Sequence, residues 1–247
     1  MKLKINQELL TKLSVIVCII SICIATGVVF YYKNVNLIKT DKLIITQPGQ
    51  VAGHFDRGKP IDRYYIDQFI GQNKKYIKGN VLEMSDDSYA KAFGQNIDKI
   101  DILDISPDHE RATMIHDLQD TAWFPENKFD CYICIQTLQY LYDIKAGMKS
   151  AHKMLKKDGV LLVTAPGIAQ LSYEEGLYFE YWHFTEKTLY NLAKDAGFSD
   201  IEVHTYGNAF ATTAFLQGIS LQDVKDRANL DHNDSWYPLI VTLVARK

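Results

Sequence analysis

From residue 61 onward, short apolar segments of strand length alternate with segments whose apolar residues repeat at helical spacing. The expected strands cover residues 80–84, 99–105, 112–115, 129–135, 160–166, 201–206 and 239–245. Strands that alternate with helices form a parallel sheet with helices on both faces. The segment "VLLVTAP" at 160–166 is apolar, as expected of a strand that is buried on both faces. The pattern therefore predicts a three-layer α/β sandwich.

Capping residues indicate where the helices between these strands begin and end. Asp62, Asp143 and Thr185 each precede an apolar helical pattern, and Gly197 follows the last of these patterns. Short polar side chains accept hydrogen bonds from the first turn of a helix, and glycine adopts the left-handed conformation that often ends one. The last two strands suggest a hairpin-like finish to the sheet.

An uncharged apolar run of twenty residues, "LSVIVCIISICIATGVVFYY" at 13–32, precedes this pattern. As a helix it would span about 30 Å, the thickness of the hydrocarbon core of a bilayer. A cleaved signal peptide is the alternative, but the run is long and lacks a clear small-x-small cleavage site. We therefore predict an N-terminal tail at 1–12, a transmembrane helix at 13–32, a linker at 33–60 and a single domain at 61–247.

Composition and cysteine spacing exclude several classes of function. The 247 residues include 27 Lys or Arg and 30 Asp or Glu, a net charge of −3, so no basic field favours nucleic acid as the main partner. Cys131 and Cys134 lie within an expected strand, and no second cysteine pair completes a zinc site. Asp86 and Asp87 are adjacent in an expected turn, where acids are usually solvated, so we predict no metal site.

Acidic and polar residues follow several of the expected strands at their carboxyl ends, where open α/β sheets bind ligands. Glu83 and Asp104 are separated by 21 positions in the sequence. That separation is typical of an acid that follows the second strand and binds ribose hydroxyls. Asp101 is the competing candidate if the second strand ends earlier.

Five segments, in order, resemble the class I S-adenosylmethionine-dependent methyltransferases. They are "VLEMSDDSY", "DISP", "HDL", "FDCYICIQTLQYLYD" and "MLKKDGVLLVTAP", and the likeness covers about residues 61–167. The segments "IDRYYIDQFI", "YWHFT" and "YGNAFATTAFLQG" further resemble a bacterial subgroup that is linked to glycosyltransferases and surface-polysaccharide assembly. The resemblance implies a mostly parallel, seven-stranded, Rossmann-like methyltransferase sheet.

The resemblance also implies where S-adenosylmethionine binds. Glu83 and the backbone of residues 85–88 would hold its methionine end, and Asp104 or Asp101 its ribose. The full set of implied cofactor-binding residues is Glu83, Ser85, Asp86, Asp101, Asp104, Asp117, Leu118 and Gln136. Asp117 and Leu118 would border the adenine, and Gln136 would lie beneath the sulfonium. Methyl transfer needs positioning more than acid or base catalysis, so no catalytic residue is assigned.

Ser85 departs from the family pattern, which has glycine where the chain approaches the cofactor closely. Serine is the smallest polar replacement and would fit if its φ angle is negative. Tyr181, Trp182 and His183 either form a wall of the acceptor pocket or pack as a hydrophobic staple over the sheet edge. The glutamates of the loop before them, Glu180 included, are expected to face solvent.

The sequence thus predicts a membrane-anchored methyltransferase acting on a small-molecule, glycan or lipid-linked acceptor. The alternative is a non-catalytic protein that keeps the fold as an interaction module. The lysines that flank the apolar run number three on each side, so they do not determine its orientation. Because the implied cofactor is made in the cytosol, we expect the domain to face the cytoplasm.

Overall fold

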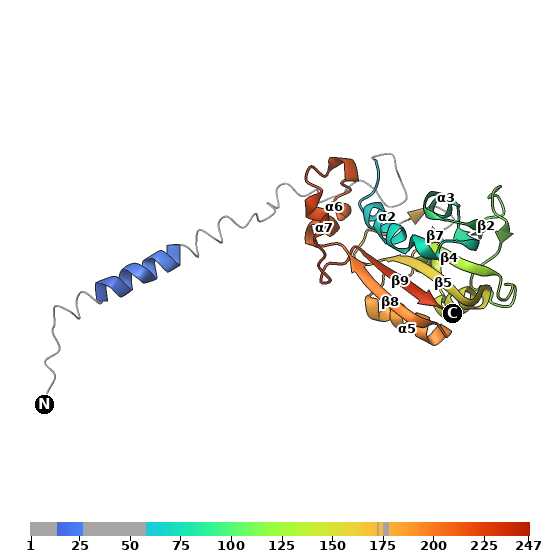
Figure 1. The fold of residues 1–247 in the computed structure, drawn as a ribbon. Helices are drawn as coiled ribbons and strands as arrows, with labels where there is room; N and C mark the ends of the chain where they lie inside the picture. The colour runs from blue at the N-terminus through green and yellow to red at the C-terminus, as the bar shows by residue number, and fades with distance from the viewer. Residues whose placement is uncertain (1–13, 27–57, 172, 175–177) are drawn as a thin grey trace, which may run out of the picture. The chain divides into compact units, whose positions relative to one another are not determined.

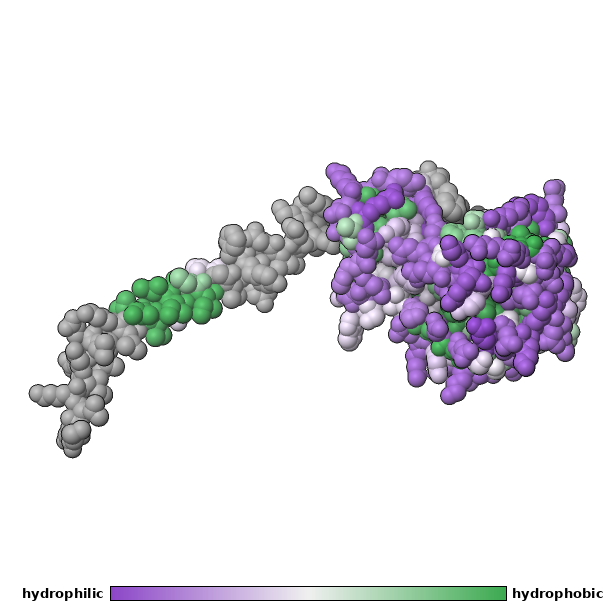
Figure 2. Space-filling model, viewed as in Figure 1, coloured by the Kyte–Doolittle hydropathy of each residue, from purple (hydrophilic) through white to green (hydrophobic). Residues whose placement is uncertain are grey.

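The structure is a computed structural model that describes residues 14–26, 58–171, 173–174 and 178–247. The chain divides into two compact units, Met1–Ile45 and Thr46–Lys247. The described part of the first unit is a helix over residues 14–26, whose side chains are all exposed. Its surface is apolar along most of its length in Figure 2. Ser21 and Thr26 donate their hydroxyls to the carbonyls of Val17 and Ile22, each at 2.9 Å.

The transmembrane prediction for residues 13–32 falls only partly on described residues. The helix at 14–26 lies inside that range, whereas residues 13 and 27–32 are outside the described residues, as are 1–12 and 33–57. Over the residues that the structure describes, no helix has both the length and the apolar composition needed to cross a bilayer.

The second unit is built on a seven-stranded sheet (Figure 1). Its strands are β1 (Gly79–Met84), β2 (Ile97–Asp104), β3 (Met114–Ile115), β4 (Phe129–Ile135), β5 (Leu155–Pro166), β8 (Ser199–Tyr206) and β9 (Ile240–Arg246). They are ordered β3-β2-β1-β4-β5-β9-β8. The strands from β3 to β5 are parallel, and β9 runs antiparallel to both β5 and β8. A small separate sheet pairs β6 (Tyr173–Glu174) with β7 (Tyr178–Phe179).

Helices cover both faces of the large sheet, which confirms the three-layer α/β sandwich. They are α2 (Asp62–Asn73), α3 (Ser88–Phe93), α4 (Ile144–Met154), α5 (Glu186–Ala196), α6 (Ala209–Leu216) and α7 (Ala228–Asp231), with 3-10 turns η2 (Lys74–Tyr76), η3 (Leu138–Tyr140) and η4 (Leu221–Asp223). Apolar residues of α4 and α5 pack on one face, and those of α2 and α6 pack on the other.

The central strand β4 shows how the sequence forms two cores. Tyr132 and Cys134 belong to the core beneath α4 and α5, whereas Cys131 and Ile133 belong to the core beneath α2 and α6. All four are at most 1% exposed, because successive side chains of a strand point to opposite faces. This confirms that the two cysteines are buried strand residues.

Most expected helix ends are observed, with one correction. Asp143 accepts a hydrogen bond from the backbone N–H of Ala146, Thr185 accepts one from Thr188, and Gly197 has a φ of 100°. Asp62 does not cap α2, because it is the first residue of the helix and the N-cap position is Ile61.

The expected hairpin-like finish is only partly correct. Strands β8 and β9 do pair antiparallel, but residues 207–239 between them hold α6, η4 and α7. The entry to the domain packs against this insertion, since Pro60 bridges Ser220 and the backbone N–H of Leu221 donates to the Lys59 carbonyl at 2.7 Å.

Candidate active site at the carboxyl ends of the strands

Glu83 lies near the carboxyl end of β1 and supports the start of α3. Its two carboxylate oxygens accept the backbone N–H groups of Tyr89 at 3.0 Å and Ala90 at 2.7 Å. A carboxylate at a helix N-terminus satisfies donors that have no partner within the helix. Because Glu83 is only 1% exposed, burial raises its pKa to about 8, although the two N–H groups oppose that shift. Glu83 therefore fixes the first turn of α3, which directly follows the loop at 85–88.

Ser85 begins that loop and has a φ of 61°, in the left-handed region. We expected serine to fit at this position if its φ is negative, and this condition is not met. Its backbone N–H donates to the Leu103 carbonyl at 2.9 Å, which fixes the loop against the end of β2. The left-handed region costs a residue with a Cβ about 1–2 kcal/mol. Position 85 thus keeps the backbone conformation of a glycine with a serine side chain that is exposed.

The two candidates for the ribose have different surroundings. One oxygen of Asp101 accepts from Lys99 and Thr113, and the other lies 3.1 Å from the Lys128 ammonium. Burial would raise the pKa of Asp101, but these partners outweigh burial and lower it. The carboxylate of Asp101 is therefore engaged in a structural ion-pair network.

Asp104 is the last residue of β2 and has an oxygen left for a ligand. Its Oδ1 accepts the backbone N–H of Ser106 at 2.8 Å, and its Oδ2 has no hydrogen-bond partner among the described residues. The side chain is nonetheless buried, at 5% exposed. Of the two acids, Asp104 is the one that is positioned to bind a hydroxyl group.

The remaining predicted cofactor residues follow β1 and β3. Asp86 is exposed, and its Oδ1 accepts the backbone N–H of Ser88 at 2.9 Å. Asp117 is half-buried and accepts both the backbone and the side-chain amide of Gln119. Leu118 is buried within the core beneath α4. The structure thus places Asp86 and Asp117 at the surface of the strand ends and Leu118 under them.

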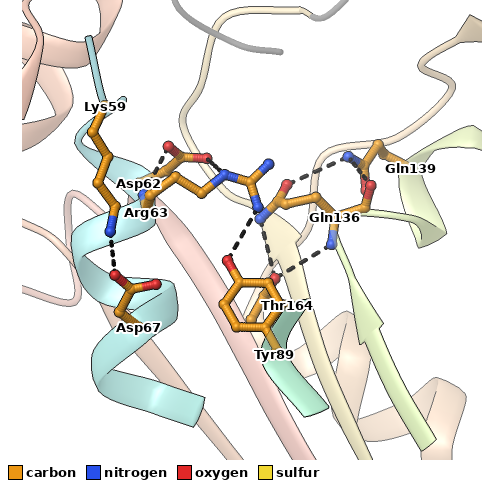
Figure 3. A network of polar contacts seen from close by, with 8 residues as sticks. All are labelled: Lys59, Asp62, Arg63, Asp67, Tyr89, Gln136, Gln139 and Thr164. Atoms are coloured by element: carbon orange, nitrogen blue, oxygen red, sulfur yellow. Dashed lines mark hydrogen bonds and ion pairs between the residues drawn. The ribbon is translucent and has the colours of Figure 1, made fainter. Parts of the chain in front are cut away.

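Gln136 follows β4 directly and has a φ of 47°. Its backbone N–H donates to the Thr164 carbonyl at 2.9 Å, and its side-chain amide lies 3.4 Å from the Thr164 hydroxyl. Gln139 donates its own side-chain amide to the Gln136 carbonyl at 3.0 Å and to its Oε1 at 3.3 Å. These contacts hold Gln136 between the ends of β4 and β5 (Figure 3).

A cavity of about 110 Å³ opens beside Gln136. We call it the polar cavity. It is lined by Asp62, Arg63, Gln136, Gln139, Tyr140, Pro166, Ala169, Gln170, Glu180, Phe215, Leu239 and Ile240.

Arg63 connects the polar cavity to the loop that follows β1. Its guanidinium lies 3.9 Å from the Asp62 carboxylate and donates to the Tyr89 hydroxyl at 3.4 Å (Figure 3). Tyr89 is also the residue whose backbone N–H donates to Glu83. Polar contacts through Arg63, Tyr89 and Glu83 therefore connect the polar cavity to the end of β1, where the loop at 85–88 begins.

A family model described as a methyltransferase domain matches residues 72–203 of this chain. The match covers more than half of the sequence and includes β1 through most of β8. The chain belongs to the methyltransferase domain family. No curated protein matches it.

Solved structures share the fold of this methyltransferase domain at low sequence identity. One is a SAM-dependent methyltransferase from Archaeoglobus fulgidus, which is 14% identical and has a TM-score of 0.51. The match covers 77% of this chain and 96% of that protein's chain. Another is phosphoethanolamine N-methyltransferase 2 of Haemonchus contortus in complex with S-adenosyl-L-methionine, 16% identical, with a TM-score of 0.50. The match covers 73% of this chain and 52% of that enzyme, so this chain spans about half of the enzyme's length.

A third structure with the same fold is described as the [4+2]-cyclase SpnF. It is 14% identical, covers 74% of this chain and 80% of its own, and has a TM-score of 0.50. Because one fold supports different reactions, the reaction has to be argued from the residues of the site.

The residues predicted for the acceptor do not line the polar cavity of this methyltransferase. Tyr181 and Trp182 are 51% and 42% exposed, and the Trp182 indole donates to the Leu141 carbonyl at 2.9 Å. His183 is exposed, with its imidazole 3.4 Å from Glu180. Their predicted role in acceptor binding stays a prediction.

Glu180 is a correction to the sequence analysis, which expected it to face solvent. Its side chain is only 4% exposed and lines the polar cavity. The reason is that the chain folds back over η3, where the backbone N–H of Tyr181 donates to the Gln139 carbonyl at 2.7 Å. Arg63, Gln139 and Gln170 were missed because they come from segments that only the folded sheet brings together.

No group of three or more His, Cys, Asp or Glu side chains that could hold a metal ion occurs in the part of the chain that the structure describes. Asp87, in the loop after β1, instead pairs with Lys91 at 2.7 Å and with Arg111.

Proposed function

We propose that this chain is a membrane-anchored S-adenosylmethionine-dependent methyltransferase that acts on a small-molecule, glycan or lipid-linked acceptor. Its methyltransferase domain makes it an enzyme of methyl transfer with S-adenosylmethionine as cofactor. When bound, this cofactor supplies an electrophilic methyl group on a cationic sulfur. The chain's own residues have to bind the cofactor, orient it and hold the acceptor in line with the methyl group.

The observation on which the cofactor assignment depends most is the Oδ2 of Asp104, which has no hydrogen-bond partner among the described residues at the end of β2. The side chain is only 5% exposed, so this carboxylate meets little water, and a ligand that donates a hydrogen bond to Oδ2 is favoured. A carboxylate suits a vicinal diol, because it accepts from hydroxyl groups without donating to them. The ribose of S-adenosylmethionine fits this position.

The loop at 85–88 fits the rest of the cofactor. Ser85 and Asp86 are exposed after the end of β1, and their backbone N–H groups donate to the carbonyls of Leu103 and Met84. Gln136 lies at the end of the adjacent strand β4, between this loop and the polar cavity. We propose that the cofactor lies over β1 and β2 with its methyl group directed toward Gln136 and the cavity.

Membrane anchoring is the part of the proposal that depends on the N-terminal sequence. The uncharged run at 13–32 supports it, together with the apolar surface of the helix at 14–26. The domain would face the cytoplasm, where the cofactor is made, and the anchor would raise the effective concentration of membrane-bound acceptors. The resemblance to the subgroup linked to surface polysaccharides agrees with such an acceptor.

Calorimetric titration of the full-length protein with S-adenosylmethionine and S-adenosylhomocysteine tests the proposal. We expect saturable binding of both at one site, and methyl transfer once an acceptor is supplied. A folded protein that binds neither compound contradicts the enzyme assignment and favours a non-catalytic interaction module.

A further inference from the structure

The polar cavity contains more hydrogen-bond acceptors than its own walls satisfy. Oε1 of Gln139 and Oε1 of Gln170 are buried and have no partner among the described residues. Gln139 as a whole is 2% exposed. The orientation of its amide is fixed, because its nitrogen faces the carbonyl and the Oε1 of Gln136. Buried polar atoms in folded proteins nearly always have a partner, so two such oxygens in one cavity point to a bound donor.

The same cavity also offers donors. The Nε of Arg63 is buried without a hydrogen-bond partner, and its Nη1 makes only a long contact of 3.4 Å to Tyr89. Guanidinium groups present five N–H donors and no acceptor. A ligand that fills this cavity therefore meets two unsatisfied amide oxygens and the unsatisfied Nε–H of Arg63.

The cavity lining carries charges of both signs, with one guanidinium, Arg63, and two carboxylates, Asp62 and Glu180. The Arg63 guanidinium faces the Asp62 carboxylate, and burial raises the pKa of Asp62 in spite of that neighbour. Glu180 supplies a second carboxylate, and the His183 imidazole lies 3.4 Å from it. A strongly charged ligand would leave one of these side chains facing a like charge in a buried space.

We infer that the polar cavity binds a neutral, hydroxyl-rich group of the methyl acceptor, namely a sugar ring. A hydroxyl is both a donor and an acceptor, so it satisfies the glutamine oxygens and the arginine N–H groups at the same time. An ammonium group only donates and would lie beside Arg63. A carboxylate or phosphate only accepts and would face Glu180 and the two free amide oxygens.

The position of the cavity agrees with an acceptor site. Gln136 lines it and directly follows β4, which pairs with β1, the strand before the loop at 85–88 that is proposed to hold the cofactor. The volume of about 110 Å³ corresponds to a few water molecules at roughly 30 Å³ each, so part of a ring enters and the rest faces the opening. This inference rests on the proposed methyltransferase function and specifies the chemistry of its acceptor.

Saturation-transfer NMR on the full-length protein tests this inference, in a detergent without a sugar headgroup and with and without S-adenosylhomocysteine. The probes are glucose, galactose, mannose and rhamnose, with ethanolamine as the cationic probe and acetate as the anionic one. We expect transfer to the ring protons of at least one hexose and none to ethanolamine or acetate. Gln170→Leu should weaken hexose binding about 3- to 10-fold, the loss expected for one hydrogen bond.

A matched variant controls for indirect effects. Gln95→Leu makes the same change at an exposed glutamine and should bind hexose like the parent. Because Oε1 of Gln170 has no partner, Gln170→Leu should unfold at the parent's midpoint or above it, which separates a binding role from a structural one.

The outcomes of this test are distinct from those of the cofactor titration. Failure of S-adenosylhomocysteine to bind the parent removes the proposed function. Normal binding of that compound with no transfer to any hexose overturns only the sugar inference. Hexose binding that Gln170→Leu leaves unchanged, or cavity-dependent binding of ethanolamine or acetate, overturns it as well.

Discussion

The backbone N–H of Ala90 donates to Oε2 of Glu83 at 2.7 Å, so a buried acid at the end of β1 holds the first turn of α3. The sequence analysis assigned Glu83 to the methionine end of the cofactor. In the structure both of its oxygens have backbone partners, which makes its first role the support of the loop at 85–88.

Glu83 should make the stability of the domain depend on pH. Its pKa of about 8 in the folded state lies above the ordinary value of 4.5, so the folded protein binds more protons than the unfolded chain between these values. The free energy of unfolding should therefore fall as pH rises from about 5 to 8, on the order of 1–4 kcal/mol. Chemical denaturation at several pH values measures this, compared with Glu83→Gln.

In Glu83→Gln the dependence on pH over that range should be weaker, because the amide does not titrate. Glu110→Gln, at an exposed position, should keep the dependence of the parent. Equal slopes for the parent and Glu83→Gln would show that Glu83 titrates normally in the folded protein.

Ser85→Gly should stabilise the protein. Glycine adopts a φ of 61° without strain, although it also increases the conformational entropy of the unfolded chain. The free energy of unfolding should rise by about 0.5–1 kcal/mol. It should also preserve or tighten binding of S-adenosylhomocysteine, whereas Ser85→Leu should abolish binding. Thermal unfolding and calorimetry measure the two effects, and if both variants bind like the parent, the loop does not contact the cofactor.

Asp104 and Asp101 should separate into a binding role and a structural role. Asp104→Ala should weaken cofactor binding by about 1–3 kcal/mol, typical of a lost charged hydrogen-bond partner. Asp101→Ala leaves Lys99 and Lys128 without their shared acid, so it should mainly lower the free energy of unfolding. Calorimetry and thermal unfolding of both variants check this, and a larger binding loss at Asp101 would transfer the ribose role to it.

The N-terminal unit should hold the full-length protein in the membrane fraction. Deletion of residues 1–45 should release a folded domain into the soluble fraction, because the second unit contains both hydrophobic cores. Protease added to intact, right-side-out cells should leave the domain uncut. Digestion beyond Lys59 without lysis contradicts the cytoplasmic orientation.

The strands were predictable from the sequence because each is a short apolar run between turn residues, as at 129–135, where prediction and structure coincide. Helix α6 was not predicted, since "AFATTAFL" is apolar all round and shows no helical periodicity. Its placement also depends on the hydrophobic core that it shares with α2, which local sequence does not encode.

Site residues could be predicted where their separation in the sequence indicates their position. They could not be predicted where the packing of distant segments brings them together. The separation of Glu83 and Asp104 pointed to the ends of β1 and β2, which are neighbours in the sheet. Spacing pointed to Asp104 and left Asp101 as the competing candidate, and the partners of each acid then distinguished them. Arg63, Gln139 and Gln170 meet only because α2 packs beside the ends of β4 and β5.

The place of β9 in the sheet has a consequence for biosynthesis. This strand follows both of its neighbours in the sequence, yet it lies between β5 and β8 and pairs with each. Until β9 is available to pair, β5 has an open edge and β8 has no partner strand. Unpaired edges are sites of aggregation in partly folded chains. The nascent protein therefore stays vulnerable until residues 240–246 leave the exit tunnel.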